Sequence, residues 1–294
     1  MASMRARVGT SRPWQEVEVD GLCVAYNDDG AGAPLVCLHA IGHGAGDFVP
    51  LRERLGGRYR VVALDWPGHG NSAADRVPVS AARYAEVLLG FLDAIGIDRA
   101  ALLGNSIGGA AAIRLAAQHA ERVRALVLAN PGGLDRVDAL SGPMTRMMAR
   151  FFAAGANGAR WYPGAYALLY RAVLSGAPAA PQRARIVAAG VEMAPALAQA
   201  WRSFGTADAD VRGLAPQVTC PVWFAWAKGD WINQLGRCRA GIRRFSNARL
   251  ETFRGGHAAF LEAPDTFAQA LERFLDSLSV DRSPESARPV ARSA

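Results

Sequence analysis

The segment GNSIGG at 104–109 has the residues that a nucleophilic serine needs. A sharp turn from a strand into a helix exposes such a serine, and it requires small residues two places before and two places after it. Gly104 and Gly108 occupy those places around Ser106. The alanine-rich segment that follows predicts a helix whose N-terminus favours a developing negative charge. Ser106 is therefore the candidate nucleophile.

A second serine lies in a similar local pattern. The segment GNSAA at 70–74 also places small residues on both sides of Ser72. It follows a Pro-Gly-His-Gly turn and precedes a polar stretch, so no strand leads into it and no helix leads out. This context favours Ser106 over Ser72 as the nucleophile.

A serine hydroxyl is a weak nucleophile, so it needs a general base and a carboxylate that orients this base. For a serine on a strand-to-helix turn, the expected chain order is Ser, then Asp or Glu, then His. His257 alone among the five histidines follows both the serine and a predicted strand. Asp230 follows the apolar run VWFAWAK through Gly229 and is the expected acid, with Asp135 as the alternative. The remaining histidines are His39, His43, His69 and His119.

Short apolar runs predict the strands that position these residues. Such runs are typical of parallel strands buried on both faces, and helical patterns at 81–95 and 107–119 alternate with them. Ser80 is the expected N-cap of the first of these helices. Upstream, EVEVDGLCVAY at 16–26 alternates around Asp-Gly, which predicts an antiparallel hairpin. The apolar runs lie at 34–39, 60–65, 100–106 and 123–130.

The strand-helix alternation stops after residue 131. Residues 132–216 contain no convincing buried strand but are helix-forming and rich in Met and aromatic residues, which predicts a helical cap over the sheet. We therefore expect a core formed by 14–131 and 217–280, with flexible tails at 1–13 and 281–294. In the second part of the core we expect strands at 221–230 and 248–257 and helices at 233–244 and 265–279.

With these motifs in this order, the sequence resembles α/β-hydrolase fold enzymes from about Trp14 to Leu278. The resemblance implies an α/β fold, a mostly parallel sheet with an N-terminal antiparallel hairpin and a helical cap insertion. It also implies an oxyanion hole made by the amide of Ile107 and an amide after the first parallel strand, either Ile41 or Gly42. The motifs are HAIG at 39–42, DWPGHGNS at 65–72, the turn at Ser106, Gly229-Asp230 and Gly256-His257.

The resemblance implies a serine hydrolase that cleaves an ester or similar acyl bond of a small, largely apolar substrate through an acyl-enzyme. A serine at 106 argues against haloalkane dehalogenases and epoxide hydrolases, which attack with a carboxylate. Three alternatives stay open: a carbon-carbon bond hydrolase of ring-fission diketones, a cofactor-free haloperoxidase, and a ligand receptor without turnover. Against the first, Ala258 stands where those enzymes often have an aromatic residue. The expected pocket residues are His39, Gly42, Met144, Met148, Trp161 and Trp231.

The composition limits the possible partners. The chain has 294 residues, 51% of them hydrophobic, and a formal charge of +7, but its arginines are scattered and form no basic stripe. We therefore expect no nucleic acid and no membrane as partner, only a small-molecule substrate. The four cysteines form no C-x-x-C pair, and the sequence contains neither a signal-peptide pattern nor a long apolar run. We expect a cytoplasmic protein without metal or cofactor, whose oligomeric state the sequence leaves undetermined.

Overall fold

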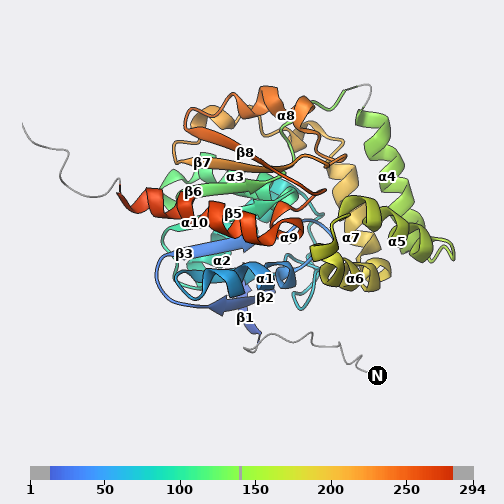
Figure 1. The fold of residues 1–294 in the computed structure, drawn as a ribbon. Coiled ribbons are helices and arrows are strands. Elements are labelled where there is room, and N and C mark those ends of the chain that lie inside the picture. The colour runs from blue at the N-terminus through green and yellow to red at the C-terminus, as the bar shows by residue number, and fades with distance from the viewer. Residues whose placement is uncertain (1–13, 139–140, 281–294) are drawn as a thin grey trace, which may run out of the picture.

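The computed structural model describes residues 14–138 and 141–280 of the chain. Its centre is an eight-stranded sheet with the order β1-β2-β4-β3-β5-β6-β7-β8 (Figure 1). The predicted tails at 1–13 and 281–294 lie outside the described residues. The strands are β1 (Gln15–Val19), β2 (Leu22–Asp29), β3 (Pro34–Leu38), β4 (Arg60–Leu64), β5 (Ala100–Asn105), β6 (Val123–Ala129), β7 (Val222–Ala227) and β8 (Ala248–Phe253).

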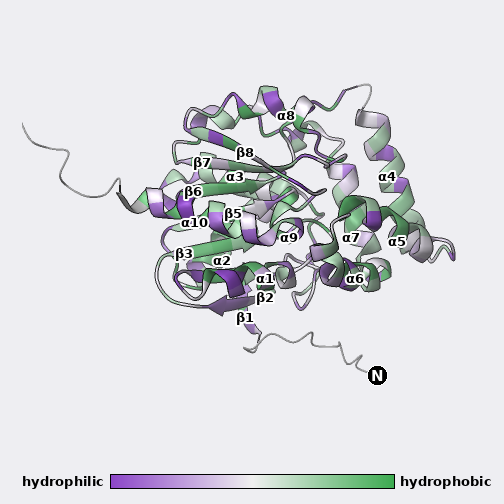
Figure 2. Ribbon diagram, in the orientation of Figure 1, coloured by the Kyte–Doolittle hydropathy of each residue, from purple (hydrophilic) through white to green (hydrophobic). Residues whose placement is uncertain are grey.

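The strands from β3 to β8 pair in parallel, and their apolar runs explain this arrangement. Every residue of β5 and β7 is buried, as expected for strands covered by helices on both faces (Figure 2). The predicted hairpin is confirmed: β1 and β2 pair antiparallel, and Asp20 (φ 50°) and Gly21 (φ 76°) form the left-handed turn between them. The mostly parallel α/β fold predicted from the sequence is therefore confirmed.

Helices cover both faces of the sheet. On one face α1 (Val49–Leu55) packs against α10 (Pro264–Val280), and on the other α2 (Ala81–Ala94) packs against α3 (Ile107–Gln118) (Figure 1). Ser80 caps α2 as predicted, because its side chain accepts a hydrogen bond from the Arg83 N–H at 3.1 Å. Two shorter helices follow the last two strands, α8 (Leu235–Ile242) and α9 (Ala259–Glu262).

Four helices lie between β6 and β7 in the chain and gather at one end of the sheet (Figure 1). Residues of three of these helices, within 148–152, 169–173 and 197–201, line the cavity at Ser106. The division into a core and a cap of residues 132–216 stays a prediction. In the part of the chain that the structure describes, no helix is long and apolar enough to cross a membrane. The four helices are α4 (Ser141–Ala156), α5 (Tyr162–Val173), α6 (Ala180–Ala188) and α7 (Gly190–Ser203).

Candidate active site

Ser106 occupies a strained turn between β5 and α3. Its backbone has φ 54° and ψ −118°, a conformation that costs a residue with a Cβ about 1–3 kcal/mol. The surrounding backbone holds it there: the Ser106 N–H donates to Ala129 O at 3.2 Å, and its carbonyl accepts from Ala110 N at 3.1 Å and Gly132 N at 2.9 Å. The turn therefore presents the side chain above the carboxyl end of the sheet.

The two glycines of the motif are required by contact with backbone atoms. A Cβ on Gly104 would lie 2.6 Å from the Gly108 carbonyl oxygen, and a Cβ on Gly108 would overlap the Leu38 carbonyl oxygen. Neither partner is a flexible side chain that could move aside. The small residues around Ser106 thus let α3 approach β5 and β3 closely.

We expect Gly108→Ala to lower the free energy of unfolding by about 1–3 kcal/mol, because the methyl group must push the backbone of Leu38 away. The change should appear as a lower midpoint of urea unfolding. Gly236→Ala is the matched control, since this exposed glycine of α8 has open space at its Cβ. That control should stabilise the protein by about 0.5–1 kcal/mol. Equal effects of the two substitutions would contradict this explanation.

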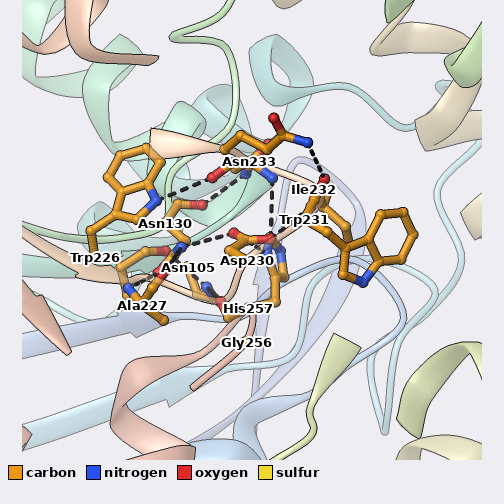
Figure 3. A network of polar contacts seen from close by, with 12 residues as sticks. Asn105, Asn130, Trp226, Ala227, Asp230, Trp231, Ile232, Asn233, Gly256 and His257 are labelled. Carbon is orange, nitrogen blue, oxygen red and sulfur yellow. Dashed lines mark hydrogen bonds and ion pairs between the residues drawn. The ribbon is translucent and has the colours of Figure 1, made fainter. Parts of the chain in front are cut away.

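The loops after β7 and β8 bring Asp230 and His257 together (Figure 3). His257 Nδ1 lies 2.8 Å from Asp230 Oδ2, and both side chains are buried. Since a carboxylate only accepts hydrogen bonds, Nδ1 carries the proton and Nε2 keeps its lone pair. His257 and Ser106 line the same cavity, although no hydrogen bond joins these two side chains. Such bonds often tighten only when substrate is bound.

The Asp230 carboxylate is surrounded by donors (Figure 3). Its Oδ1 accepts from the backbone N–H groups of Ile232 at 2.9 Å and Asn233 at 3.1 Å. Its Oδ2 accepts from Asn130 Nδ2 at 2.8 Å in addition to His257. These donors fix the carboxylate and compensate for its burial.

The His257 imidazole has a raised pKa. Burial alone would lower the pKa of the ring, but the adjacent Asp230 carboxylate and its hydrogen bond, together with the charge of Glu262, raise it above the ordinary value of 6.5. The loop is also held: the His257 N–H donates to Val173 O at 2.8 Å, and its carbonyl accepts from Asn105 Nδ2 at 3.0 Å. The cap helix α5 and the strand before Ser106 therefore both contact this loop.

Buried histidines fix the loop after β3. His39 donates from Nδ1 to Ala40 O at 2.7 Å and accepts at Nε2 from Trp66 N at 2.9 Å. His69 accepts at Nε2 from the Gly42 N–H at 3.0 Å. Burial lowers the pKa of His69 to about 4, so the ring is neutral near neutral pH and can accept this bond. The Gly42 N–H is therefore already bonded in the interior.

The two amides that face the serine have no such partner. Within the described residues, neither the Ile107 N–H, at the first position of α3, nor the Ile41 N–H donates a hydrogen bond. Ile41 and Ile107 both line cavities that reach Ser106. Between the two candidates that the sequence left open, this geometry favours Ile41 over Gly42.

Two cavities meet at Ser106. The wide cavity has a volume of 170 Å³ and lies under α4 and the end of α7, and the narrow cavity of 40 Å³ lies between the loop after β3 and the cap. The narrow cavity is lined mainly by apolar side chains, whereas apolar and polar side chains both line the wide one. Trp201, Phe204 and Trp231 contribute to both. A substrate carbonyl at Ser106 would place one substituent in each cavity.

The structure corrects part of the expected pocket. Met144 lines the wide cavity, Met148 the narrow one and Trp231 both, but the other three predicted residues line neither. His39 is wholly buried behind the loop after β3, and Gly42 packs on Leu197. Trp161 is 55% exposed and contacts the rings of Phe151 and Tyr162, because the aromatic residues of the cap pack on one another.

The alternative nucleophile and acid have other surroundings. Ser72 is buried, and its Oγ donates to Asp65 O at 2.6 Å and accepts from Ala25 N at 2.9 Å. Asp135 pairs with Arg237 rather than with a histidine. Within the described residues, neither Ser72 nor Asp135 forms a hydrogen bond or ion pair with His257, so the geometry favours Ser106 and Asp230.

Sequence reasoning missed Asn130 and Glu262. Asn130 has φ 46° directly after β6, where it donates to Asp230, and Glu262 accepts from Gly256 N at 2.6 Å and Gly176 N at 2.7 Å. The position of Asn130 at the carboxyl end of a predicted strand was the only available signal. In residues 14–138 and 141–280, no three His, Cys, Asp or Glu side chains are grouped to hold a metal ion.

A sequence profile of the alpha/beta hydrolase family matches residues 35–270. The chain belongs to the alpha/beta hydrolase family. This alpha/beta hydrolase is 36% identical over 126 residues to 2-hydroxy-6-oxo-6-phenylhexa-2,4-dienoate hydrolase of Comamonas testosteroni, which covers 40% of the chain and 43% of that relative. It is 42% identical over 119 residues to 2-hydroxy-6-oxononadienedioate/2-hydroxy-6-oxononatrienedioate hydrolase of Paraburkholderia phymatum, covering 38% of the chain and 41% of that protein. The chain thus spans less than half the length of these curated relatives.

The similarity of the alpha/beta hydrolase to a solved structure extends further along the chain. The crystal structure of a membrane phospholipase A, described as a bacterial virulence factor, superposes with a TM-score of 0.79 at 25% identity. This match covers 91% of the present chain and 86% of the phospholipase. The fold is therefore shared over nearly the whole hydrolase.

Proposed function

We propose that this hydrolase cleaves an ester or similar acyl bond of a small, largely apolar substrate through an acyl-enzyme. The observation that carries the proposal is the position of Ser106, on a strained turn where two cavities meet. Ser106 shares the narrow cavity with His257, which is bound to Asp230. A nucleophile, an oriented base and two free amides are the parts that acyl transfer requires.

In the proposed reaction, Ser106 Oγ attacks the substrate carbonyl while His257 Nε2 accepts its proton. The amides of Ile41 and Ile107 donate to the oxyanion, where the N-terminus of α3 adds favourable charge. His257 then gives the proton to the leaving group and afterwards activates the water that hydrolyses the acyl-enzyme. Asp230 keeps the proton of the imidazole on Nδ1 and stabilises the imidazolium that forms.

Labelling with a fluorophosphonate tests the proposal directly. The purified protein should acquire one phosphonate on Ser106, located by peptide mass spectrometry, and should hydrolyse p-nitrophenyl esters of short acids. A folded protein that neither labels nor turns over any ester would favour a receptor without turnover, and the proposal would then be wrong.

A second candidate is hydrolysis of a carbon-carbon bond in a ring-fission diketone. It is favoured by the identity to the hydrolases of Comamonas testosteroni and Paraburkholderia phymatum, whose names specify hydroxy-oxo-dienoate substrates. The same serine, base and oxyanion amides would serve this reaction, because it also begins at a carbonyl. Loss of the visible absorbance of 2-hydroxy-6-oxo-6-phenylhexa-2,4-dienoate, compared with release of p-nitrophenol from an ester, separates the two candidates.

The raised pKa of His257 predicts the pH dependence of the reaction. The base must be neutral, so kcat/KM should rise with pH through the pKa of His257, and the midpoint of this acid limb should lie above 6.5. Asp230 and Glu262 are the charges that raise this pKa. Initial rates with a p-nitrophenyl ester, read at the isosbestic wavelength of p-nitrophenol, give the midpoint. A midpoint at or below 6.5 would contradict this prediction.

A cytoplasmic location is part of the same proposal. It is supported by the four cysteines, Cys23, Cys37, Cys220 and Cys238, all of which are free thiols. We expect a small molecule to be the only partner required for turnover.

A further inference from the structure

The narrow cavity contains a second histidine that is held in the same way as His257. His43 lines this cavity together with Ser106 and His257. Its Nδ1 lies 2.5 Å from Oδ2 of Asp47, a carboxylate with no exposed surface. Within the described residues, its Nε2 has no hydrogen-bond partner. The cavity therefore contains two imidazoles, each bound to a buried carboxylate through Nδ1.

The other buried histidines near this loop, His39 and His69, have no ring nitrogen left without a partner. His39 and His69 are also buried, but both nitrogens of each ring are bonded to backbone groups. Both ring nitrogens of His39 and of His69 therefore already have hydrogen-bond partners within the protein, as expected for histidines that fix a loop. His43 differs because one nitrogen is fixed and the other is left for a molecule in the cavity.

The Asp47 carboxylate also pairs with a cationic side chain of α6. Arg185 of α6 forms an ion pair with Asp47 Oδ1, while His43 occupies Oδ2. Burial alone would raise the pKa of Asp47, but His43 and Arg185 outweigh it and lower this pKa. A carboxylate only accepts hydrogen bonds, so His43 donates from Nδ1, and Nε2 is the ring nitrogen left for a molecule in the cavity.

We propose that His43 Nε2 determines specificity by accepting a hydrogen bond from a hydroxyl, alcoholic or enolic, on the part of the substrate that enters the narrow cavity. The inference rests on the proposed acyl transfer at Ser106. Other side chains around this cavity are largely apolar and include Met148, Phe152, Leu169 and Leu197. A methyl group in place of the hydroxyl would bury the His43 acceptor without a partner. A site built for a hydrogen bond discriminates strongly against such an analogue.

Matched pairs of esters test this inference on the wild-type protein. In the first pair, p-nitrophenyl 3-hydroxybutanoate is compared with p-nitrophenyl 3-methylbutanoate, so the hydroxyl lies on the acyl side. In the second, 2-hydroxyethyl butanoate is compared with propyl butanoate, so the hydroxyl lies on the alcohol side. After division by the rates of alkaline hydrolysis, kcat/KM should favour the hydroxylated member of one pair by about tenfold or more. Turnover of both pairs without preference would overturn the role of His43.

Variants assign the preference to His43. His43→Phe should abolish it, because the phenyl ring keeps the aromatic contact with Tyr170 and leaves Asp47 paired with Arg185 but has no acceptor. His119→Phe, the same change on a partly exposed histidine outside the two cavities, should retain the preference. If circular dichroism shows that His43→Phe is unfolded, the same pairs of esters are measured with His43→Leu. A preference that survives in a folded His43 variant would overturn the assignment.

The outcomes separate this inference from the proposed function. Hydrolysis of the methylated and propyl esters and phosphonate labelling of Ser106 depend on the catalytic residues, whereas the preference within a pair depends on His43. Labelling and turnover without a preference would leave the acyl-transfer proposal intact and remove only the role of His43. Absence of both labelling and turnover would overturn the acyl-transfer proposal itself.

Discussion

Replacing Ser106 with alanine is expected to lower kcat for a p-nitrophenyl ester by about 100,000-fold or more. The substitution removes the oxygen that forms the acyl-enzyme in the proposed reaction. The free energy of unfolding should change little, because Ser106 Oγ makes no hydrogen bond with any described residue. Steady-state rates and phosphonate labelling, followed by intact mass, measure the loss. Labelling of the alanine variant at wild-type stoichiometry would show that another residue is the nucleophile.

Ser72→Ala is the matched control for this experiment. The Ser72 hydroxyl joins Ala25 N and Asp65 O in the interior, so its removal leaves two buried backbone groups without this partner. We expect a loss of about 1–3 kcal/mol in the free energy of unfolding, with phosphonate labelling at Ser106 retained. Although the two serines have similar local sequences, loss of the Ser106 hydroxyl should lower kcat, and loss of the Ser72 hydroxyl should lower the free energy of unfolding.

The elements of the sheet were predictable because their sequence patterns follow directly from burial. Strands covered on both faces need continuous apolar runs, and a strand-to-helix turn as tight as that at Ser106 needs glycines. The edge strand β8 is less regular, since five of its six residues are exposed. It was nevertheless predicted, because it precedes the Gly-Gly-His segment that the fold requires.

The arrangement of the cap could not be predicted in the same way. Its helices carry many aromatic residues, and sequence alone does not tell which of them face the sheet and which pack on one another. Trp161 was expected at the substrate but lies at the surface on Phe151 and Tyr162, whereas Trp201 and Phe204 line the cavities. Helix orientation depends on contacts between residues far apart in the chain.

Some residues of the candidate site can be identified from their local sequence, whereas others depend on partners far away in the chain. Ser106 and His257 were proposed from local turns and chain order. Asn130 was not, because an amide after a strand has many possible partners and only the folded chain brings Asp230 to it. The pair formed by His43 and Asp47 was also missed, since its importance lies in facing Ser106 across a cavity.

Asp230→Asn is expected to lower kcat by about 1,000–10,000-fold without unfolding the protein. All four neighbours of the Asp230 carboxylate donate hydrogen bonds, two from backbone N–H groups and two from the side chains of Asn130 and His257. An asparagine has only one oxygen, and the backbone donors cannot move away from it. Its NH₂ group must then face His257, which favours the tautomer with the proton on Nε2. That ring cannot accept a proton from Ser106.

The pH profile of the residual activity distinguishes this mechanism from a simple loss of structure. Without the carboxylate, burial is left as the dominant influence and lowers the pKa of His257, so the acid limb of kcat/KM should move to lower pH than in the wild type. An unchanged acid limb with a reduced plateau would contradict this explanation.

Asp135→Asn completes the test of the acid. Asp135 lines the wide cavity but is partly exposed, and its carboxylate forms an ion pair with Arg237, so its neutralisation removes an ion pair that solvent screens. We expect kcat to fall by less than about tenfold, since a lost surface ion pair is worth about 1 kcal/mol or less and leaves the tautomer of His257 unchanged. A larger loss of kcat in Asp135→Asn than in Asp230→Asn would show that Asp135, and not Asp230, is the carboxylate that orients His257. The four donors to Asp230 argue for the opposite result, because these hydrogen bonds fix its carboxylate against His257.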